Sequence, residues 1–96
     1  MNKTFDISDF VGVPSVESTL VSLTERVRAR RKEMKLSQKL LAERSGVSYA
    51  SLRRFESTGE ISLVSLINIA AALGCMQDFE QLFREPKVTS IKDLKL

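Results

Sequence analysis

Two adjacent arginines, Arg53 and Arg54, lie in a short segment whose side chains suit hydrogen bonding to nucleic acid. Arginine presents a planar set of N–H donors that can pair with two acceptors of a guanine or with phosphate oxygens. Tyr49 adds a hydroxyl and an aromatic ring, and Ala50 is short enough to approach a thymine methyl group closely. A helix that projects these residues from one face is suited to the major groove of DNA.

The segment Ser48–Ser57 is expected to form that helix. Its first residue is a good N-cap, because the serine hydroxyl can accept a hydrogen bond from a free backbone N–H of the first turn. Leu52 and Phe55 lie one turn apart and form the face that packs inward. We expect Arg54 to read a base and Arg53 to serve the DNA backbone. The base-facing or phosphate-facing candidates are Ser48, Tyr49, Ala50, Arg53 and Arg54.

A second short helix, Gln38–Ser45, precedes it across a tight turn. Ser37 is its expected N-cap, and Gly46 can adopt a positive φ angle that ends it abruptly. Leu41 and Ala42 should face the core, since Ala42 is small enough to let the next helix cross nearby. Lys39 and Arg44 of this helix are either phosphate contacts or exposed solubilising charges.

These two helices and their turn resemble the helix-turn-helix of the Cro and phage-repressor family, often called the XRE type. The resemblance runs from about Glu25 to Phe83 and implies an all-α, five-helix DNA-binding domain. It also implies that Gln38, at a helix N-terminus, helps to hold a phosphate. The matching positions are Gln38, Leu41, Ala42, Gly46, Val47, Ser48, Leu52, Glu56 and Gly59.

One local departure from the phage repressors follows Ser48–Ser57, the expected recognition helix. Two residues, Ser57 and Thr58, separate Glu56 from Gly59, where phage repressors usually have one. We therefore expect a longer loop at this exit, with the helix itself intact.

The resemblance implies an internal ion pair between Arg31 and Glu56. An arginine fork suits a paired carboxylate better than lysine does, and the pair would tie the first helix to the end of the recognition helix. Arg31 is then structural. The neighbouring basic residues that stay freer to meet phosphates are Arg26, Arg28, Arg30 and Lys32.

Charge is distributed unevenly along the chain. The net charge is +3, yet residues 26–54 hold ten basic and two acidic residues, a local net charge of +8. Residues 1–25 carry −3 and residues 55–96 carry −2. A solvated helix face would explain a basic segment alone, but its coincidence with the helix-turn-helix pattern indicates phosphate contacts.

Three further helices are expected around this pair. The first begins with Ser15 as its cap and carries an apolar stripe at helical spacing. The other two cover residues 63–73 and 78–83, with Ser62 and Asp78 as caps. The stripe of the first helix consists of Val16, Leu20, Leu23, Val27 and Met34.

The last helix is a candidate both for the core and for an interface. Phe79 and either Leu82 or Phe83 are expected to point toward the core. Members of the resembled family commonly dimerise through this helix and the loop before it, and a symmetric dimer would read half-sites about 34 Å apart. The alternative is that the aromatic residues only complete the monomer core. The interface candidates are Cys75, Met76, Phe79 and Phe83.

The chain is expected to consist of an N-terminal arm (1–14), a DNA-binding domain (15–83) and a tail (84–96). The arm is either a docking segment or a mobile end. The apolar residues of the tail fit a short strand or a partner-binding segment. The tail resembles extensions of small antitoxins, particularly HipB-like proteins encoded with HipA-type kinases, and this implies a kinase toxin as partner.

Composition argues against other classes of function. The chain has no histidine and one cysteine, so neither a metal site nor an internal disulfide is expected, in agreement with a reducing cytoplasm. No Gly-rich phosphate loop and no carboxylate pair indicates an enzyme, and no cofactor is expected. No apolar run reaches the roughly 18–20 residues that span a bilayer, and the N-terminus is not typical of a secretory signal.

We therefore predict a cytoplasmic, dimeric, sequence-specific DNA-binding regulator that represses by occupying an inverted-repeat operator. A HipA-type kinase toxin is its predicted second partner. The alternatives are a stand-alone repressor of the same type and a protein-interaction module that kept the fold but lost DNA binding. The basic charge of residues 26–54 favours DNA binding over the latter.

Overall fold

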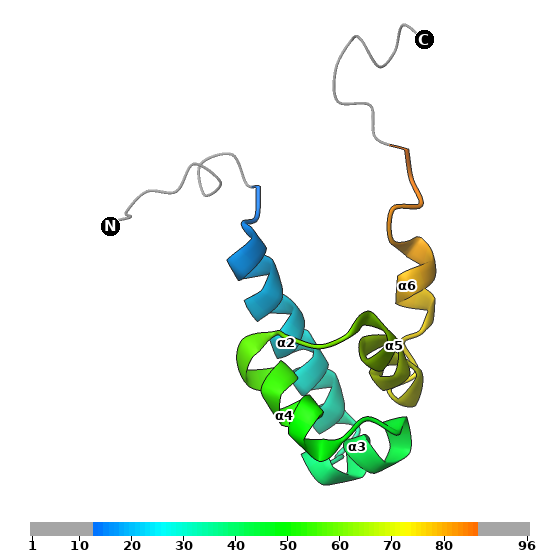
Figure 1. Cartoon of the computed structure of the whole chain (residues 1–96). Helices are drawn as coiled ribbons and strands as arrows, with labels where there is room; N and C mark the ends of the chain where they lie inside the picture. The colour runs from blue at the N-terminus through cyan, green and yellow to red at the C-terminus, as the bar shows by residue number, and fades with distance from the viewer. Residues whose placement is uncertain (1–12, 87–96) are drawn as a thin grey trace, which may run out of the picture.

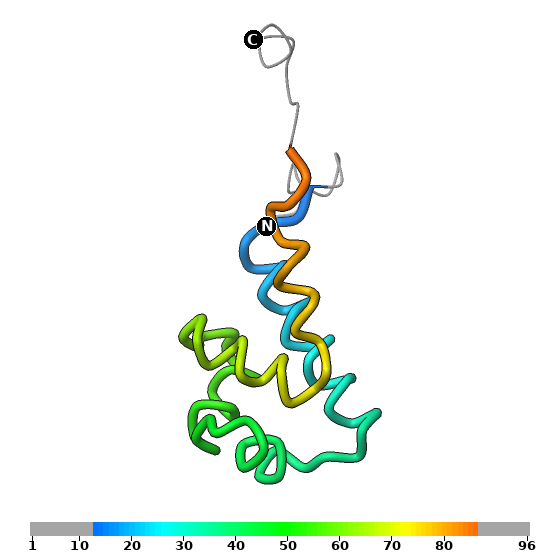
Figure 2. The backbone as a smooth tube through the Cα atoms, turned by 90° about the vertical axis from the view of Figure 1, so that its right-hand side faces the viewer, coloured from blue at the N-terminus to red at the C-terminus, as the bar shows by residue number. Residues whose placement is uncertain are grey.

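Within residues 13–86, which the computed structural model describes, the chain is helical and contains no strand. Helices α3 and α4 pack on each other, α4 also packs on α2, and α3 also packs on α5. The first half of α2 and the whole of α6 extend from this packed end as two arms (Figure 1), and Figure 2 shows that both arms project to the same side of it. The all-α class expected from the sequence is confirmed. The helices are α2 (Val16–Glu33), α3 (Gln38–Ser45), α4 (Tyr49–Thr58), α5 (Leu63–Ala72) and α6 (Gln77–Gln81).

The expected N-terminal arm and C-terminal tail fall almost entirely on residues 1–12 and 87–96, which lie outside the described part of the chain. No helix of residues 13–86 has both the length and the apolar character needed to cross a membrane.

The core lies where α2, α3, α4 and α5 meet. Leu41, Leu52, Phe55 and Ile69 have no exposed surface, and each such burial contributes about 1.5–3 kcal/mol of transfer free energy. Because Leu52 and Phe55 hold one face of α4 inward, the opposite face of α4 is left in solvent. The core is completed by Leu36, Ala42, Val47 and Leu73.

Serine hydroxyls begin α2, α3, α4 and α5, because each accepts a hydrogen bond that the first turn of its helix would otherwise lack. The N–H donor lies three residues on in every case, at 3.0 or 3.1 Å. The capping residues are Ser15, Ser37, Ser48 and Ser62.

Helix α6 differs from its prediction. Its N-cap is Met76, without a side-chain hydrogen bond, and Asp78 lies inside the first turn. Leu82 and Phe83 lie past its end and are 54% and 97% exposed, so their expected approach to the core is wrong. The reason is that α6 leads away from the packed end of the molecule, so the residues after it do not reach the core. Phe79, the aromatic residue of α6, is half-buried.

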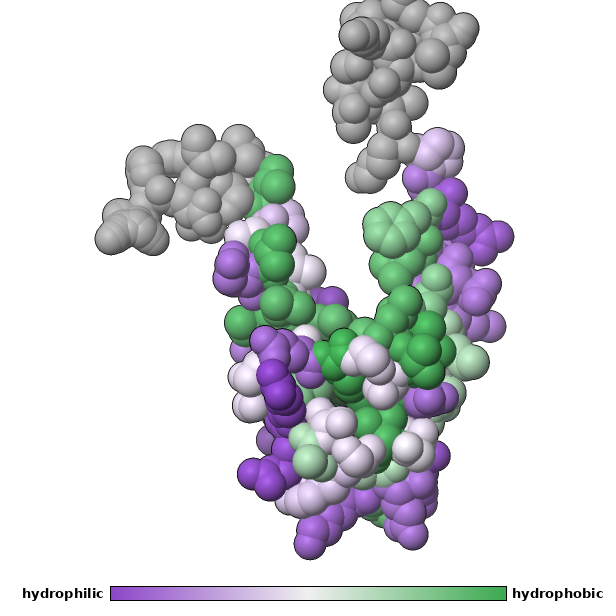
Figure 3. Space-filling model, viewed as in Figure 1, coloured by the Kyte–Doolittle hydropathy of each residue, from purple (hydrophilic) through white to green (hydrophobic). Residues whose placement is uncertain are grey.

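The apolar stripe of α2 is partly buried from Leu23 onward and exposed before it. Leu23 and Val27 pack against the core, whereas Val16 is 73% exposed. Figure 3 shows apolar surface on both arms and in the hollow between them. This surface has no partner within the described chain.

The exit from α4 is also different from its prediction. The additional residue lengthens the helix, which continues through Thr58, and not the loop. Thr58 Oγ1 donates a hydrogen bond to the Arg54 carbonyl oxygen at 2.8 Å, and the Gly59 N–H donates to the Phe55 carbonyl oxygen at 2.8 Å. These bonds carry the helix to Thr58 before Gly59, in the left-handed conformation (φ +84°), reverses the chain.

Replacement of Gly59 by alanine is expected to destabilise the fold more than the same change at Gly46. Both residues have positive φ, +84° and +76°, so either alanine costs roughly 1–2 kcal/mol of backbone strain. A Cβ at position 59 would also lie 3.2 Å from Leu20 Cβ, whereas nothing lies within 4 Å of one at position 46. Urea denaturation measures both losses, and equal losses would contradict the packing of Gly59 on α2.

Candidate nucleic-acid interface

The carboxylate of Glu56, on α4, is buried and joins three helices. Arg31 of α2 donates from Nε to Glu56 Oε2 at 2.8 Å and from Nη2 to Oε1 at 2.9 Å. Gln38 of α3 donates from Nε2 to the same Oε1 at 2.8 Å. Arg31 Nη1 donates to the Leu36 carbonyl oxygen at 3.0 Å, so each guanidinium nitrogen has a partner. Arg31 and Glu56 are 8% and 4% exposed, and the ion pair implied by the resemblance is therefore an internal one.

Two pKa values are shifted by these contacts and their neighbours. Burial alone would raise the pKa of the Glu56 carboxyl, but hydrogen bonds from Arg31 and Gln38 and the charges of Arg31 and Arg28 outweigh it and hold this pKa below its ordinary value. The pKa of Arg30 is raised, first by its hydrogen bond to Glu33 and then by Cys75.

Arg28 and Arg30 lie on different sides of α2, although the sequence made both candidates for phosphate contact. Arg28 faces α4, where its Nη2 donates to the Glu56 carbonyl oxygen at 2.6 Å. Arg30 instead donates from Nη1 to Glu33 at 2.8 Å and from Nε to the Leu73 carbonyl oxygen, at the end of α5, at 3.3 Å. Arg30 is therefore turned toward α5 and away from α4, and its contact with a phosphate stays a prediction.

An open, polar depression of about 760 Å³ lies between α2, the start of α3 and the exposed side of α4. Four of its lining residues are arginines, and its one carboxylate, Glu56, is already neutralised by Arg31. The depression is therefore positively charged and suits a phosphate group. Its lining consists of Arg28, Arg31, Gln38, Ala50, Arg53, Arg54, Glu56 and Ser57.

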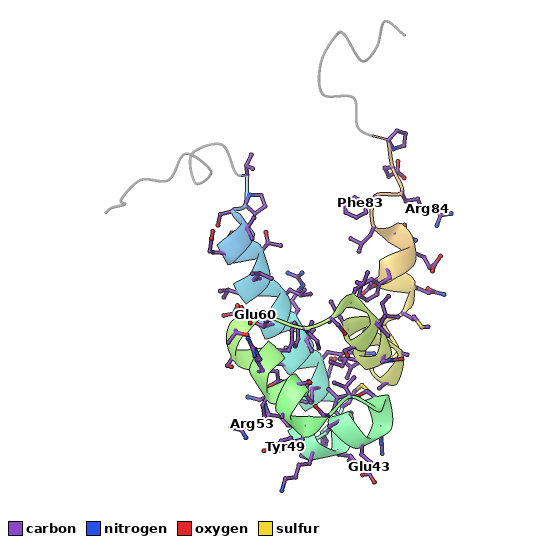
Figure 4. All side chains as sticks on the ribbon, in the orientation of Figure 1. Glu43, Tyr49, Arg53, Glu60, Phe83 and Arg84 are labelled. Carbon is purple, nitrogen blue, oxygen red and sulfur yellow. The ribbon has the colours of Figure 1, made fainter. Side chains whose placement is uncertain are left out.

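At the N-terminal end of α4, Tyr49 lies between two cations. Lys39 Nζ is 5.5 Å from the centre of the tyrosine ring, and Arg53 Cζ is 5.4 Å from it. Both distances are within cation–π range. The ring is 38% exposed, and Figure 4 shows Tyr49 and Arg53 at the end of α4 that lies beside α3. This group presents two positive charges and one aromatic hydroxyl to the solvent.

Arg54 has a partner that the sequence did not indicate. Its Nε donates to Glu60 Oε1 at 3.1 Å, and its Nη2 contacts the same oxygen. Glu60 lies in the loop after α4, six residues from Arg54, at a spacing that matches no helical period. The two side chains meet because hydrogen bonds of the Thr58 hydroxyl turn the chain back after α4, and the sequence pattern does not show these bonds.

The remaining predicted residues fall into two groups. The hydroxyl of Ser48 caps α4 and is also bonded to Ser51, so the structure gives it a structural role. The four interface candidates lie before α6, on it or just after it, on the arm opposite the depression (Figure 1). They are Cys75, Met76, Phe79 and Phe83.

The family model described as "Helix-turn-helix" matches residues 27–75, just over half of the chain, and this range includes every residue that lines the depression. The chain belongs to the XRE-type helix-turn-helix family. As a member of this family it is a DNA-binding regulator. No curated protein and no solved structure matches it. Within residues 13–86 of this XRE-type protein, no group of His, Cys, Asp and Glu side chains is placed to hold a metal ion.

Replacement of Glu56 by glutamine is expected to lower the free energy of unfolding by about 3–5 kcal/mol, because it leaves the Arg31 charge buried without a counter-charge. The pKa of Glu56 is lowered by folding, so its stabilising effect is complete above the ordinary glutamate pKa and is lost as pH falls through the lowered value. The difference between the two proteins should therefore be constant near neutral pH and shrink below roughly pH 4.

Urea denaturation at neutral and acidic pH measures this difference. Glu43→Gln is the matched control, because Glu43 is exposed and makes no ion pair with residues 13–86. This control should stay within about 0.5 kcal/mol of the wild type. A Glu56→Gln loss as small as that of the control, or one that does not change with pH, would contradict the role given to the buried carboxylate.

Proposed function

We propose that this XRE-type protein binds a specific DNA operator by placing α4 in the major groove. The observation that carries the proposal is the positive depression along the exposed side of α4. Ala50, Arg53 and Arg54 come from α4 itself, and Arg28 comes from α2. A major groove admits one α-helix, so phosphates on its border would meet the basic residues that flank α4 while its exposed face meets base edges.

The start of α3 supplies a second phosphate contact in this proposal. The Gln38 side-chain amide is committed to Glu56, so its expected hydrogen bond to a phosphate would have to come from the backbone. Ser37 satisfies the N–H of Leu40, which leaves the N–H groups of Gln38 and Lys39 for an anion. The ammonium group of Lys39 adds charge beside them.

We further propose that the protein binds DNA as a symmetric dimer joined through the α6 arm. A five-residue helix is too short to be stable alone in water, and α6 is followed by the exposed apolar residues Leu82 and Phe83. Met76, before α6, is also 48% exposed. A second copy would cover this surface together with Cys75 and Phe79, and would present two α4 helices to half-sites about 34 Å apart.

In this proposal the dimer acts in the cytoplasm and represses transcription by occupying an inverted-repeat operator, including that of its own promoter. A HipA-type kinase toxin is proposed as its protein partner. The support for this partner is the resemblance of the tail to antitoxin extensions, and the tail lies mainly in residues 87–96, outside the described part.

Arg53→Ala is expected to weaken binding to all duplexes by about ten-fold and to reduce the slope of log K against log salt by about one. Arg84→Ala removes the same charge from the α6 arm, far from Arg53 (Figure 4), and should leave affinity and slope unchanged. Fluorescence anisotropy measures both, with a duplex recovered by selection from a randomised pool and a duplex of unrelated sequence. Equal effects of the two substitutions would contradict the placement of DNA on α4.

Phe83→Ser is expected to shift the protein from dimer to monomer in analytical ultracentrifugation, because an aromatic residue central to an interface contributes about 2 kcal/mol or more. Val64→Ser is the control, since Val64 is 71% exposed but lies on α5. A wild type that is monomeric when it saturates its selected duplex would contradict the dimer, as would dissociation by the Val64 substitution alone.

A further inference from the structure

A carboxylate lies beside the arginine most suited to reading a base. Glu60 Oε1 accepts hydrogen bonds from Arg54 Nε, at 3.1 Å, and from Arg54 Nη2. Figure 4 shows Glu60 close to the C-terminal end of α4, which it follows in the chain. Arg54 and Glu60 are both about two-thirds exposed, at 67% and 64% of their side chains. An ion pair this exposed contributes little to folding stability, so its main effect is on the orientation and the charge of Arg54.

The backbone that carries Glu60 is fixed relative to Arg54. Thr58 Oγ1 donates to the Arg54 carbonyl oxygen at 2.8 Å and accepts from the Glu60 N–H at 3.0 Å. Gly59 between them packs against Leu20 of α2. The Thr58 hydroxyl and the left-handed Gly59 therefore hold the turn that brings Glu60 back to Arg54.

The contact leaves a defined set of donors on Arg54. A guanidinium group has five N–H bonds, and Glu60 takes the edge formed by Nε and Nη2. The end formed by Nη1 and the second N–H of Nη2 stays open, and it has the spacing for the O6 and N7 acceptors of a guanine. An arginine held in this way keeps one orientation and loses less rotamer freedom on binding.

The same carboxylate acts against a phosphate contact. The negative charge of Glu60 partly offsets the charge of Arg54 and repels a phosphate placed next to the pair. A base edge carries no net charge, so it does not meet this repulsion. The pair thus favours recognition of a base over non-specific attraction to the DNA backbone.

We propose that Glu60 is a specificity-determining positioning residue, which holds Arg54 so that its free end reads a guanine in the operator. This inference rests on the proposed placement of α4 in the major groove. Arg54 contacts the base, and Glu60 acts only through Arg54.

The test is selection from a pool of duplexes with a randomised core of about two helical turns, followed by sequencing, for wild type, Glu60→Gln and Glu25→Gln. Glu25 is exposed on α2 and forms no ion pair with the described residues, so its replacement makes the same change in net charge. Glu60→Gln is expected to reduce the preference for guanine at one position per half-site by about ten-fold, while affinity for unrelated duplex stays equal or rises. Glu25→Gln should keep the wild-type preference.

A double-mutant cycle with Arg54→Ala separates a positioning role from a general effect of charge. Glu60→Gln should have no further effect on base preference once Arg54 is gone. An unchanged base preference in Glu60→Gln would overturn the inference, and so would an effect of Glu60→Gln that persists when Arg54 is absent. In either case a wild type that selects a specific sequence would leave the proposed function standing. A wild type that selects no sequence would overturn both, and that failure is visible before any variant is compared.

Discussion

The buried ion pair of Arg31 and Glu56 is the interaction on which the arrangement of α2, α3 and α4 depends. Removing two charges from water is unfavourable, and the pair is stable only because its remaining hydrogen-bonding capacity is met by Gln38 and the Leu36 carbonyl oxygen. Arg31 lies on α2, Gln38 at the start of α3 and Glu56 on α4. The hydrogen bonds of the pair are therefore complete only when these three helices are packed together. The exposed face of α4 is set by this condition as much as by the apolar core.

The core and the ion pair hold α4 from two sides, and this division explains the charge of its outer face. Leu52 and Phe55 pack inward, and Glu56 is neutralised from α2. Basic residues of α4 and α2 are consequently left around a depression whose one carboxylate has no free charge. The depression is positive because the one carboxylate in its lining, Glu56, is neutralised by Arg31 behind it.

Most of the fold could be predicted from local signals. Capping serines and apolar spacing define α2 to α5, because each signal lies within one or two turns of the residue it controls. Arg30 and Glu60 could not be placed in this way, since the side of α2 that an arginine occupies and the path of a loop depend on distant contacts. Helix α6 is too short to follow from its own residues, and it was the helix with the poorest prediction.

The central claim is that α4 is the DNA-contacting surface, and amide chemical-shift mapping of the isotope-labelled protein tests it most directly. On titration with a duplex recovered by selection, the largest changes should cluster at residues 37–39 and 48–54 and at the Nε–H signals of Arg53 and Arg54. The amides of α6 should change little. Changes that follow α6 and the first half of α2, with α4 unaffected, would contradict the account.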